Sequence, residues 1–149
     1  MDSIYERTTL KELTQRLDKL TASSKRLWGK MDVAQMLAHC SNVIEMAIGE
    51  KAGKSSLMGK VIGPFVKGVV TSEKPFKQNM PTDNNFIVSD SKDFYKEKVR
   101  LTILLTRLSA SGPEFMHNRR HSFFGKLTSR EWSNSTVKHL DHHFRQFGV

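Results

Sequence analysis

Three of the six histidines lie close together near the end of the chain, within residues 138–148. If this stretch is helical, His139 and His143 project from the same side, about 40° apart, because each residue turns the helix by roughly 100°. This is a spacing at which two imidazoles can bind one metal ion. His142 would point about 100° away from His143, so we rank it behind the other two as a ligand.

His39 is the best candidate for a third ligand, because it falls on the flank of an apolar helical stripe, beside Val43 and Met46. Three neutral imidazoles would leave the charge of a divalent ion uncompensated and at least one coordination position open. Such an ion lowers the pKa of the water or thiol that it binds. Imidazole ligands are compatible with zinc, nickel, iron or copper; we expect zinc or nickel first, with iron or manganese as alternatives.

Each of these residues also has a simpler interpretation. His139 and His143 could be polar residues on a helix near the surface, and His39 could be a hydrogen-bonded core histidine. Gln146 could support a metal ligand through a hydrogen bond, or it could only cap the end of the helix.

Other residues with reactive side chains are weaker candidates for a functional site. His117 and His121 repeat the four-residue spacing, but the nearby proline and the lack of an apolar stripe argue against a helix there. Cys40 could be a nucleophile, although a buried cysteine is commonly a small apolar filler. Glu131 is explained by a helix cap, and Asp141 should face away from the histidines. We therefore assign no catalytic residue.

Four amphipathic stretches predict the helices that would position these residues. Each begins with a residue suited to capping, and two begin with the complete capping-box pattern, Thr9 with Glu12 and Thr128 with Glu131. The predicted starts are Thr9, Asp32, Asp90 or Ser91, and Thr128, and the first three helices end near Leu20, Gly49 and Gly112.

A long segment of different character separates the second and third predicted helices, from Gly49 to about Ser89. It is rich in glycine and proline, so residues 57–70 could form a weak helix or a packed irregular crossover. The sequence therefore predicts an all-α fold, a four-helix bundle with a long crossover between helices 2 and 3. This crossover is also the most basic part of the chain, with Lys51, Lys54, Lys60, Lys67, Lys74 and Lys77.

Length and composition set further limits. A chain of 149 residues predicts a single domain, residues 1–149, and its formal charge of +9 would favour anionic partners. The lone Cys40 excludes an intrachain disulfide. The first residues carry no basic leader, and no apolar run reaches membrane-spanning length, so we expect a cytoplasmic protein without a membrane segment.

Several motifs together resemble the DinB/YfiT-like superfamily of metalloenzymes, and most closely its branch with a His-Leu-Asp-His-His and Arg-Gln-Phe-Gly ending. The similarity spans most of the chain. The residues that carry it are Trp28-Gly29-Lys30-Met31, Ala34-Gln35-Met36-Leu37-Ala38-His39, Pro81-Thr82, Phe124-Gly125-Lys126-Leu127-Thr128, Glu131-Trp132 and the stretch from Lys138 to Gly148.

The resemblance implies an up-down-down-up four-helix bundle with a metal held by one histidine of the second helix and two of the fourth. Those positions here are His39, His139 and His143. The wider superfamily includes metal-dependent enzymes that use low-molecular-weight thiols, notably bacillithiol S-transferases and mycothiol-dependent isomerases. This chain departs from the commoner His-Arg-Gly-Gln ending: here Phe144-Arg145-Gln146 follows His143.

These observations lead to three hypotheses of different class. The first is a metal-dependent transferase in which basic crossover residues recognise the carboxylates of a thiol cosubstrate. The second is a small metal-dependent hydrolase, which lacks an evident general base. The third is a non-enzymatic basic module for nucleic acid or an acidic protein; no nucleic-acid-binding motif supports it. Bundles of this type often pair through helix faces, so a homodimer stays open, although no stripe in the sequence identifies its interface.

Overall fold

The computed structural model is mostly helical, as the sequence predicts, and describes residues 2–51, 57–80 and 82–149. The regular elements of the described chain are five α-helices, one 3-10 helix and one small sheet. In chain order they are α1 (Arg7–Asp18), α2 (Val33–Ile48), α3 (Leu57–Thr71), η1 (Asn84–Phe86), α4 (Phe94–Met116), β1 (Arg120–His121), β2 (Gly125–Lys126) and α5 (Ser129–Gln146).

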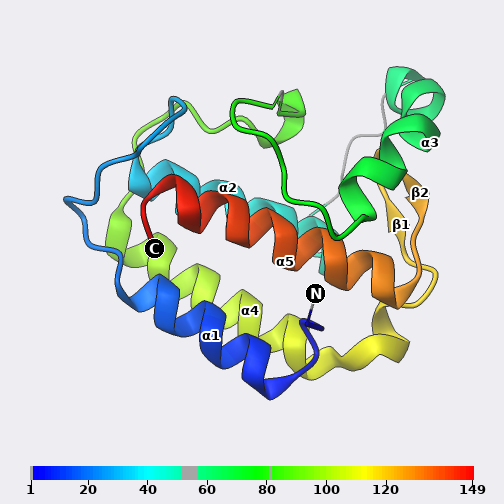
Figure 1. Ribbon diagram of the computed structural model, residues 1–149, viewed down its shortest axis with the longest axis horizontal. Helices are drawn as coiled ribbons and strands as arrows, with labels where there is room; N and C mark the ends of the chain where they lie inside the picture. Colours follow the sequence, from blue (N-terminus) through cyan, green and yellow to red (C-terminus); the bar gives the residue numbers. More distant parts are fainter. Residues whose placement is uncertain (1, 52–56, 81) are drawn as a thin grey trace.

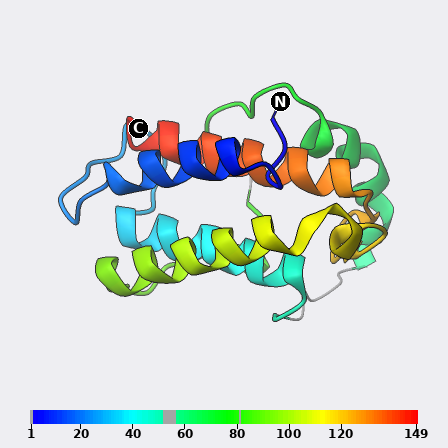
Figure 2. The same ribbon diagram turned by 90° about the horizontal axis from the view of Figure 1, so that it is seen from below.

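Four of the helices lie in two layers, with α1 beside α5 and α2 beside α4 (Figures 1 and 2). Helices α1 and α5 run in one direction, and α2 and α4 run in the opposite direction (Figure 1). All four contribute side chains that are at most 2% exposed to a common apolar core. These include Leu13, Leu17, Met36, Leu37, Leu101, Leu105, Leu140 and Phe144.

The two helices that carry the candidate histidines begin where the sequence predicts. At the start of α2, Asp32 accepts a hydrogen bond from the Gln35 backbone N–H at 2.8 Å, and Gln35 accepts one from the Asp32 N–H at 3.0 Å. At the start of α5, Thr128 and Glu131 form the same reciprocal pair. These capping boxes satisfy backbone donors that the first helical turn leaves without partners.

The starts of α1 and α4 differ from the predicted ones. Helix α1 already begins at Arg7, after a residue that makes no side-chain cap, and Thr9 is buried inside the helix. The segment before it is fixed by tertiary packing instead, because Ile4 is fully buried and its N–H donates to Ser133 Oγ at 2.9 Å. Helix α4 is capped by Asp93, which lies directly before the buried Phe94, and not by Asp90 or Ser91.

The predicted end of the third helix is a break rather than an end. Gly112 has φ 75° and ψ 169° inside α4, in the left-handed region that favours glycine. Helical structure resumes at Pro113 and continues to Met116. The extra turn buries the Met116 side chain completely, which explains why the chain does not leave the core at Gly112.

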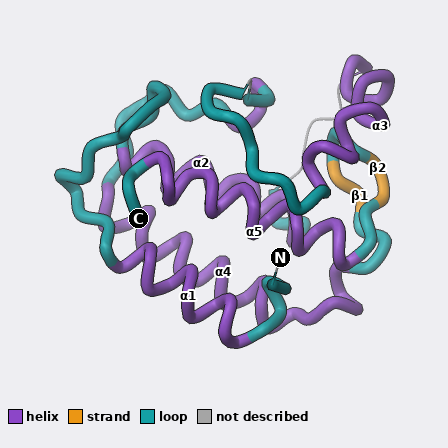
Figure 3. The backbone as a smooth tube through the Cα atoms, viewed as in Figure 1, coloured by secondary structure: helices purple, strands orange, loops and turns teal. Residues whose placement is uncertain are grey.

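The crossover forms a regular helix, α3, followed by a mostly irregular return to α4 (Figure 3). Two side chains of α5 bind the end of α3. The buried Lys138 donates to the carbonyl oxygens of Val69 and Ser72, and Asn134 donates to that of Thr71. These contacts satisfy carbonyls that the last helical turn leaves free. Lys54 of the basic crossover and Pro81 of the resemblance motif lie outside the described residues.

Over the ranges that the structure describes, no helix is long and apolar enough to cross a membrane.

A short hairpin that the sequence did not predict precedes α5. Strands β1 and β2 pair antiparallel, and the His121 ring packs against Phe124 and Trp132 at centroid distances of 4.4 and 5.4 Å. The Nδ1 of His121 accepts a hydrogen bond from the Phe123 N–H at 3.0 Å. Burial lowers the pKa of His121 to about 4, although the charge of Asp83 acts in the opposite direction. The hairpin therefore contains a neutral histidine.

We expect this histidine to make folding sensitive to acid. Between pH 6.5 and about 4, unfolded His121 binds a proton that the folded form excludes, so the free energy of unfolding falls as pH falls. The full contribution is present above pH 6.5. In His121→Gln the pH dependence of stability should be shallower by up to about one proton, or ~1.4 kcal/mol per pH unit. Urea unfolding at several pH values measures this slope.

His117→Gln is the matched control, because His117 is exposed and lies only four residues away. It should keep the slope of the parent protein. If the free energy of unfolding depends on pH equally steeply in the parent and in His121→Gln, His121 is not the source of the acid sensitivity.

Candidate metal centre

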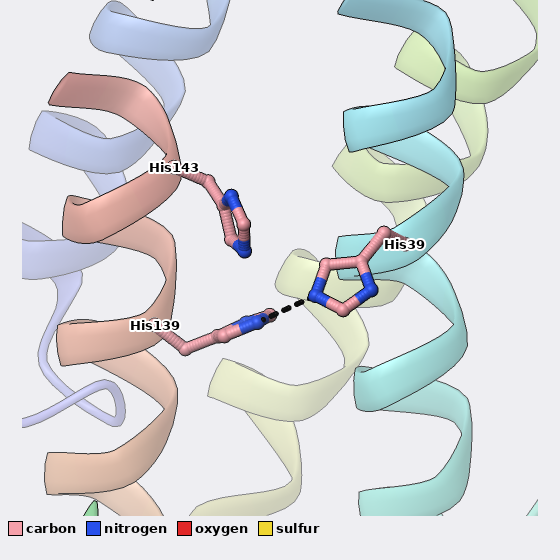
Figure 4. A group of neighbouring side chains, drawn as sticks. All are labelled: His39, His139 and His143. Carbon is pink, nitrogen blue, oxygen red and sulfur yellow. Dashed lines mark hydrogen bonds between the residues drawn. The ribbon is translucent and has the colours of Figure 1, made fainter. Parts of the chain in front are cut away.

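The three histidines singled out from the sequence converge between the two layers of helices. His39 comes from α2, and His139 and His143 come from successive turns of α5, with their rings directed toward one another (Figure 4). One nitrogen from each ring lies within 4.8 Å of the other two. His39 and His139, which are 100 residues apart in the sequence, thus belong to one cluster.

Two of the rings are oriented by hydrogen bonds through Nδ1. The Nδ1 of His39 lies 2.8 Å from the Phe86 carbonyl oxygen, and that of His143 lies 2.9 Å from Gln146 Oε1. A carbonyl oxygen can only accept, so each Nδ1 must carry the hydrogen. Each Nε2 then presents a lone pair, which is the form that binds a metal.

The ring of His139 supplies the third nitrogen, and the three nitrogens are close enough together to bind one ion. The Nε2 atoms of His39 and His139 are 2.9 Å apart, and two imidazole nitrogens this close need a proton or a cation between them. In tetrahedral zinc sites with bonds of about 2.0–2.1 Å, ligand nitrogens lie roughly 3.4 Å apart. That value falls between the closest pair and the 4.8 Å that encloses all three, so small ring movements would suffice.

Burial keeps these histidines neutral. His39 and His143 are only 3% and 7% exposed, and burial lowers the pKa of both, that of His143 to about 3. Burial also lowers the pKa of His139 well below its usual range, and the neighbouring histidines lower it further. Neutral imidazoles bind a cation without first releasing a proton to solvent. Within the described residues, the cluster includes no carboxylate, so it would not neutralise a divalent ion.

His142 lies beside the cluster but outside it. Its half-buried ring packs edge-on against Trp28 and Phe76, at centroid distances of 5.9 and 5.8 Å. The indole Nε1 of Trp28 is buried and has no hydrogen-bond partner among the described residues. The candidate centre therefore has an aromatic flank formed by residues from three separate parts of the chain.

The contacts of Gln146 decide between its two interpretations. Its Oε1 accepts from His143, and its Nε2 donates to the Trp28 carbonyl at 2.8 Å, which fixes the orientation of the amide. Gly29 has φ +80°, and a Cβ there would lie 2.3 Å from Gln146 Nε2. The Trp28-Gly29 turn thus holds the side chain that orients His143, and in the part of the chain that the structure describes this side chain caps no backbone group at the end of α5.

The other reactive residues lie elsewhere. Cys40 is fully buried, and burial raises the pKa of its thiol far above the usual range, so it stays protonated. Asp141 forms an ion pair with an arginine of α1, and Glu131 pairs with a lysine of α3 while it caps α5. His117 and His121 form no metal-binding group with a third ligand among the residues that the structure describes.

The roles of three contributors to the site could not be predicted from the sequence. Phe86 acts through its backbone carbonyl, which every residue type possesses. Phe76 reaches His142 only because α3 returns the chain to α5. Gly29 is needed for its backbone angle and for the absence of a side chain, which a single sequence does not distinguish from an ordinary turn glycine.

Comparison with known proteins identifies a family. A family model described as "Protein of unknown function (DUF1569)" matches residues 5–148, nearly the whole chain. No curated protein and no solved structure matches.

Replacing Gln146 tests the orientation of His143. In Gln146→Leu the His143 Nδ1–H loses its acceptor, and we expect the affinity for zinc to fall by about 10–100-fold. Isothermal titration of the metal-free protein measures it. Gln15→Leu, at an exposed position of α1, is the control and should bind as the parent does. Equal affinity in the parent and in Gln146→Leu would show that this hydrogen bond does not support metal binding.

Proposed function

The chain belongs to the DUF1569 family of proteins of unknown function, and we propose that it is a divalent-metal-dependent enzyme that uses a low-molecular-weight thiol. The observation that carries the proposal is the convergence of three neutral imidazoles, two of them buried and the third, that of His139, partly buried. Burying three polar rings at one point costs free energy, which a function in binding a cation would explain.

The proposal includes membership of the DinB-like superfamily and its up-down-down-up four-helix bundle, in a single domain. Two features support this. The direction of α1 and α5 is opposite to that of α2 and α4 (Figure 1), and the long crossover lies between α2 and α4. The histidines also occupy the positions that the resemblance implies, one on the second and two on the last helix of the bundle.

We propose His39, His139 and His143 as the ligands of zinc or nickel, with iron or manganese as alternatives. A divalent ion at this site would lower the pKa of a thiol or water that it binds, so that the anion forms near neutral pH. The protein contributes orientation: the Phe86 carbonyl and Gln146 fix two of the three rings before any ion binds. Three neutral ligands leave a net positive charge, which favours an anionic sulfur ligand.

The return from α3 supplies the candidate groups for recognising a thiol cosubstrate. Phe76 contacts His142, and Lys74 and Lys77 are exposed within two residues of it in the chain. Their ammonium groups suit the carboxylates of a small thiol. Lys67 and Lys138 are less suited, because Lys67 pairs with Glu131 and the buried Lys138 holds the end of α3.

Metal content is the first measurement. Untagged, gently purified protein should contain about one transition-metal ion per chain by elemental analysis. His139→Ala should contain little, because two imidazoles hold an ion much less tightly than three, whereas His117→Ala should retain it. No metal in the parent, even after reconstitution with zinc, nickel, iron and manganese, would remove the basis of the enzyme hypothesis.

Thiol transfer is measured next, with 1-chloro-2,4-dinitrobenzene and a panel of small thiols that includes bacillithiol and mycothiol. The thiol loses its proton to solvent, a carbon–sulfur bond forms, and chloride leaves. We expect metal-dependent turnover that falls roughly a hundredfold or more in His39→Ala and His143→Ala. Lys77→Gln should raise the KM for the thiol, and Lys11→Gln should not.

Undiminished turnover in both histidine variants would contradict the proposal. Thiol-independent cleavage of ester, amide or phosphoester substrates, with no transfer to any thiol, would instead favour the metal-dependent hydrolase.

A further inference from the structure

Helix α4 has a second apolar face, directed to solvent. Tyr95, Val99 and Ile103 follow one another at four-residue spacing and are 72%, 60% and 52% exposed. The opposite side of α4 is already buried in the core through Leu101 and Leu105. A helix that is apolar on its outer side as well indicates a contact with another molecule.

The exposed stripe lies in a groove of about 670 Å³ on the α2–α4 layer, which forms one outer side of the molecule (Figure 2). The three apolar side chains line it together with charged groups of α4 and of the end of α2. The charged residues are Glu45, Glu50, Lys96, Arg100 and Arg107.

The charges of the groove differ between its two ends. Lys96 lies at the end near the start of α4, and its ammonium group has no partner in the part of the chain that the structure describes. Glu50 and Arg107 form an exposed ion pair at the other end, 11 residues along, or about 16 Å at a rise of about 1.5 Å per residue. Between them, Arg100 is bound by Glu45 and Glu97.

We propose that this face binds a second copy of the chain, with the two α4 helices antiparallel about a twofold axis. In a twofold contact, residue i faces residue j and j faces i. An antiparallel arrangement centred near residue 101 places Val99 against the partner's Ile103 and Tyr95 against the partner's Arg107. Each Lys96 then lies beside the partner's Glu50.

The distribution of charge selects this orientation and this occupant. Parallel helices would place Lys96 against the partner's Lys96 and Arg107 against the partner's Arg107, which is repulsive. The antiparallel pair instead supplies each free ammonium with a carboxylate and covers both apolar stripes. The face is thus complementary to itself, which is the requirement for a closed homodimer.

The mass in solution tests the proposal, with analytical ultracentrifugation up to ~100 μM so that a weak dimer is also populated. The parent protein should sediment at twice the 17.0 kDa of one chain. Ile103→Glu, which places a charge in the centre of the contact, should sediment as a monomer. Phe65→Glu is the control: it changes a side chain on α3 that is 85% exposed, and it should remain dimeric. A monomeric parent, or a dimeric Ile103→Glu variant, would overturn the proposal.

Disulfide crosslinking tests the orientation, because the only native cysteine, Cys40, is fully buried. The double variant Val99→Cys/Ile103→Cys should form a crosslinked dimer on mild oxidation, since the two positions face each other across the axis. Tyr95→Cys alone should not crosslink, because antiparallel helices hold the two copies of that residue far apart. Efficient crosslinking of Tyr95→Cys would indicate parallel helices and overturn the orientation.

Discussion

The packing of three uncharged imidazoles between two helix layers, two of them buried and one partly buried, is the constraint on which the rest of the structure depends. A buried polar ring is costly unless its hydrogen-bonding groups have partners. His39 finds one in the carbonyl of Phe86, and His143 finds one in the amide of Gln146. The first bond ties α2 to η1. Gln146 also donates to the Trp28 carbonyl, which ties α5 to the turn at Trp28-Gly29. The hydrogen bonds that offset the free-energy cost of burying these rings therefore also fix the positions of the helices that carry them.

Periodicity in the sequence predicted the helices because their apolar stripes are wide and their caps are local. Asp32 with Gln35 and Thr128 with Glu131 need only a few residues to be recognised, and both are present as predicted. The predicted start of α1 was wrong, because the packing of Ile4 in the core fixes this end of the helix and no local cap does so. Residues 57–70 could not be decided from propensity, since their helix is held at its end by side chains of the distant α5.

The candidate site was predictable where residue type carries the information. The four-residue spacing of His139 and His143 and the flank position of His39 could be read from the sequence, and the structure places these three rings together. The groups that orient them could not be read, because a carbonyl oxygen or a positive φ has no residue signature of its own. The outward stripe of α4 was missed for a related reason: its three residues are interspersed with polar and buried residues of the same helix, and only the observed exposure separates them from the buried stripe.

Both tryptophans of the chain lie against a histidine. Trp28 contacts His142 on the flank of the candidate centre, and Trp132 contacts His121 at the hairpin. Indole emission responds to the charge and polarity of such neighbours, so the intrinsic fluorescence of the protein combines two local signals, one from each end of α5. Selective replacement of Trp132 by phenylalanine would leave an optical reporter of the centre alone. The native chain thus contains a built-in probe beside the residues of greatest interest.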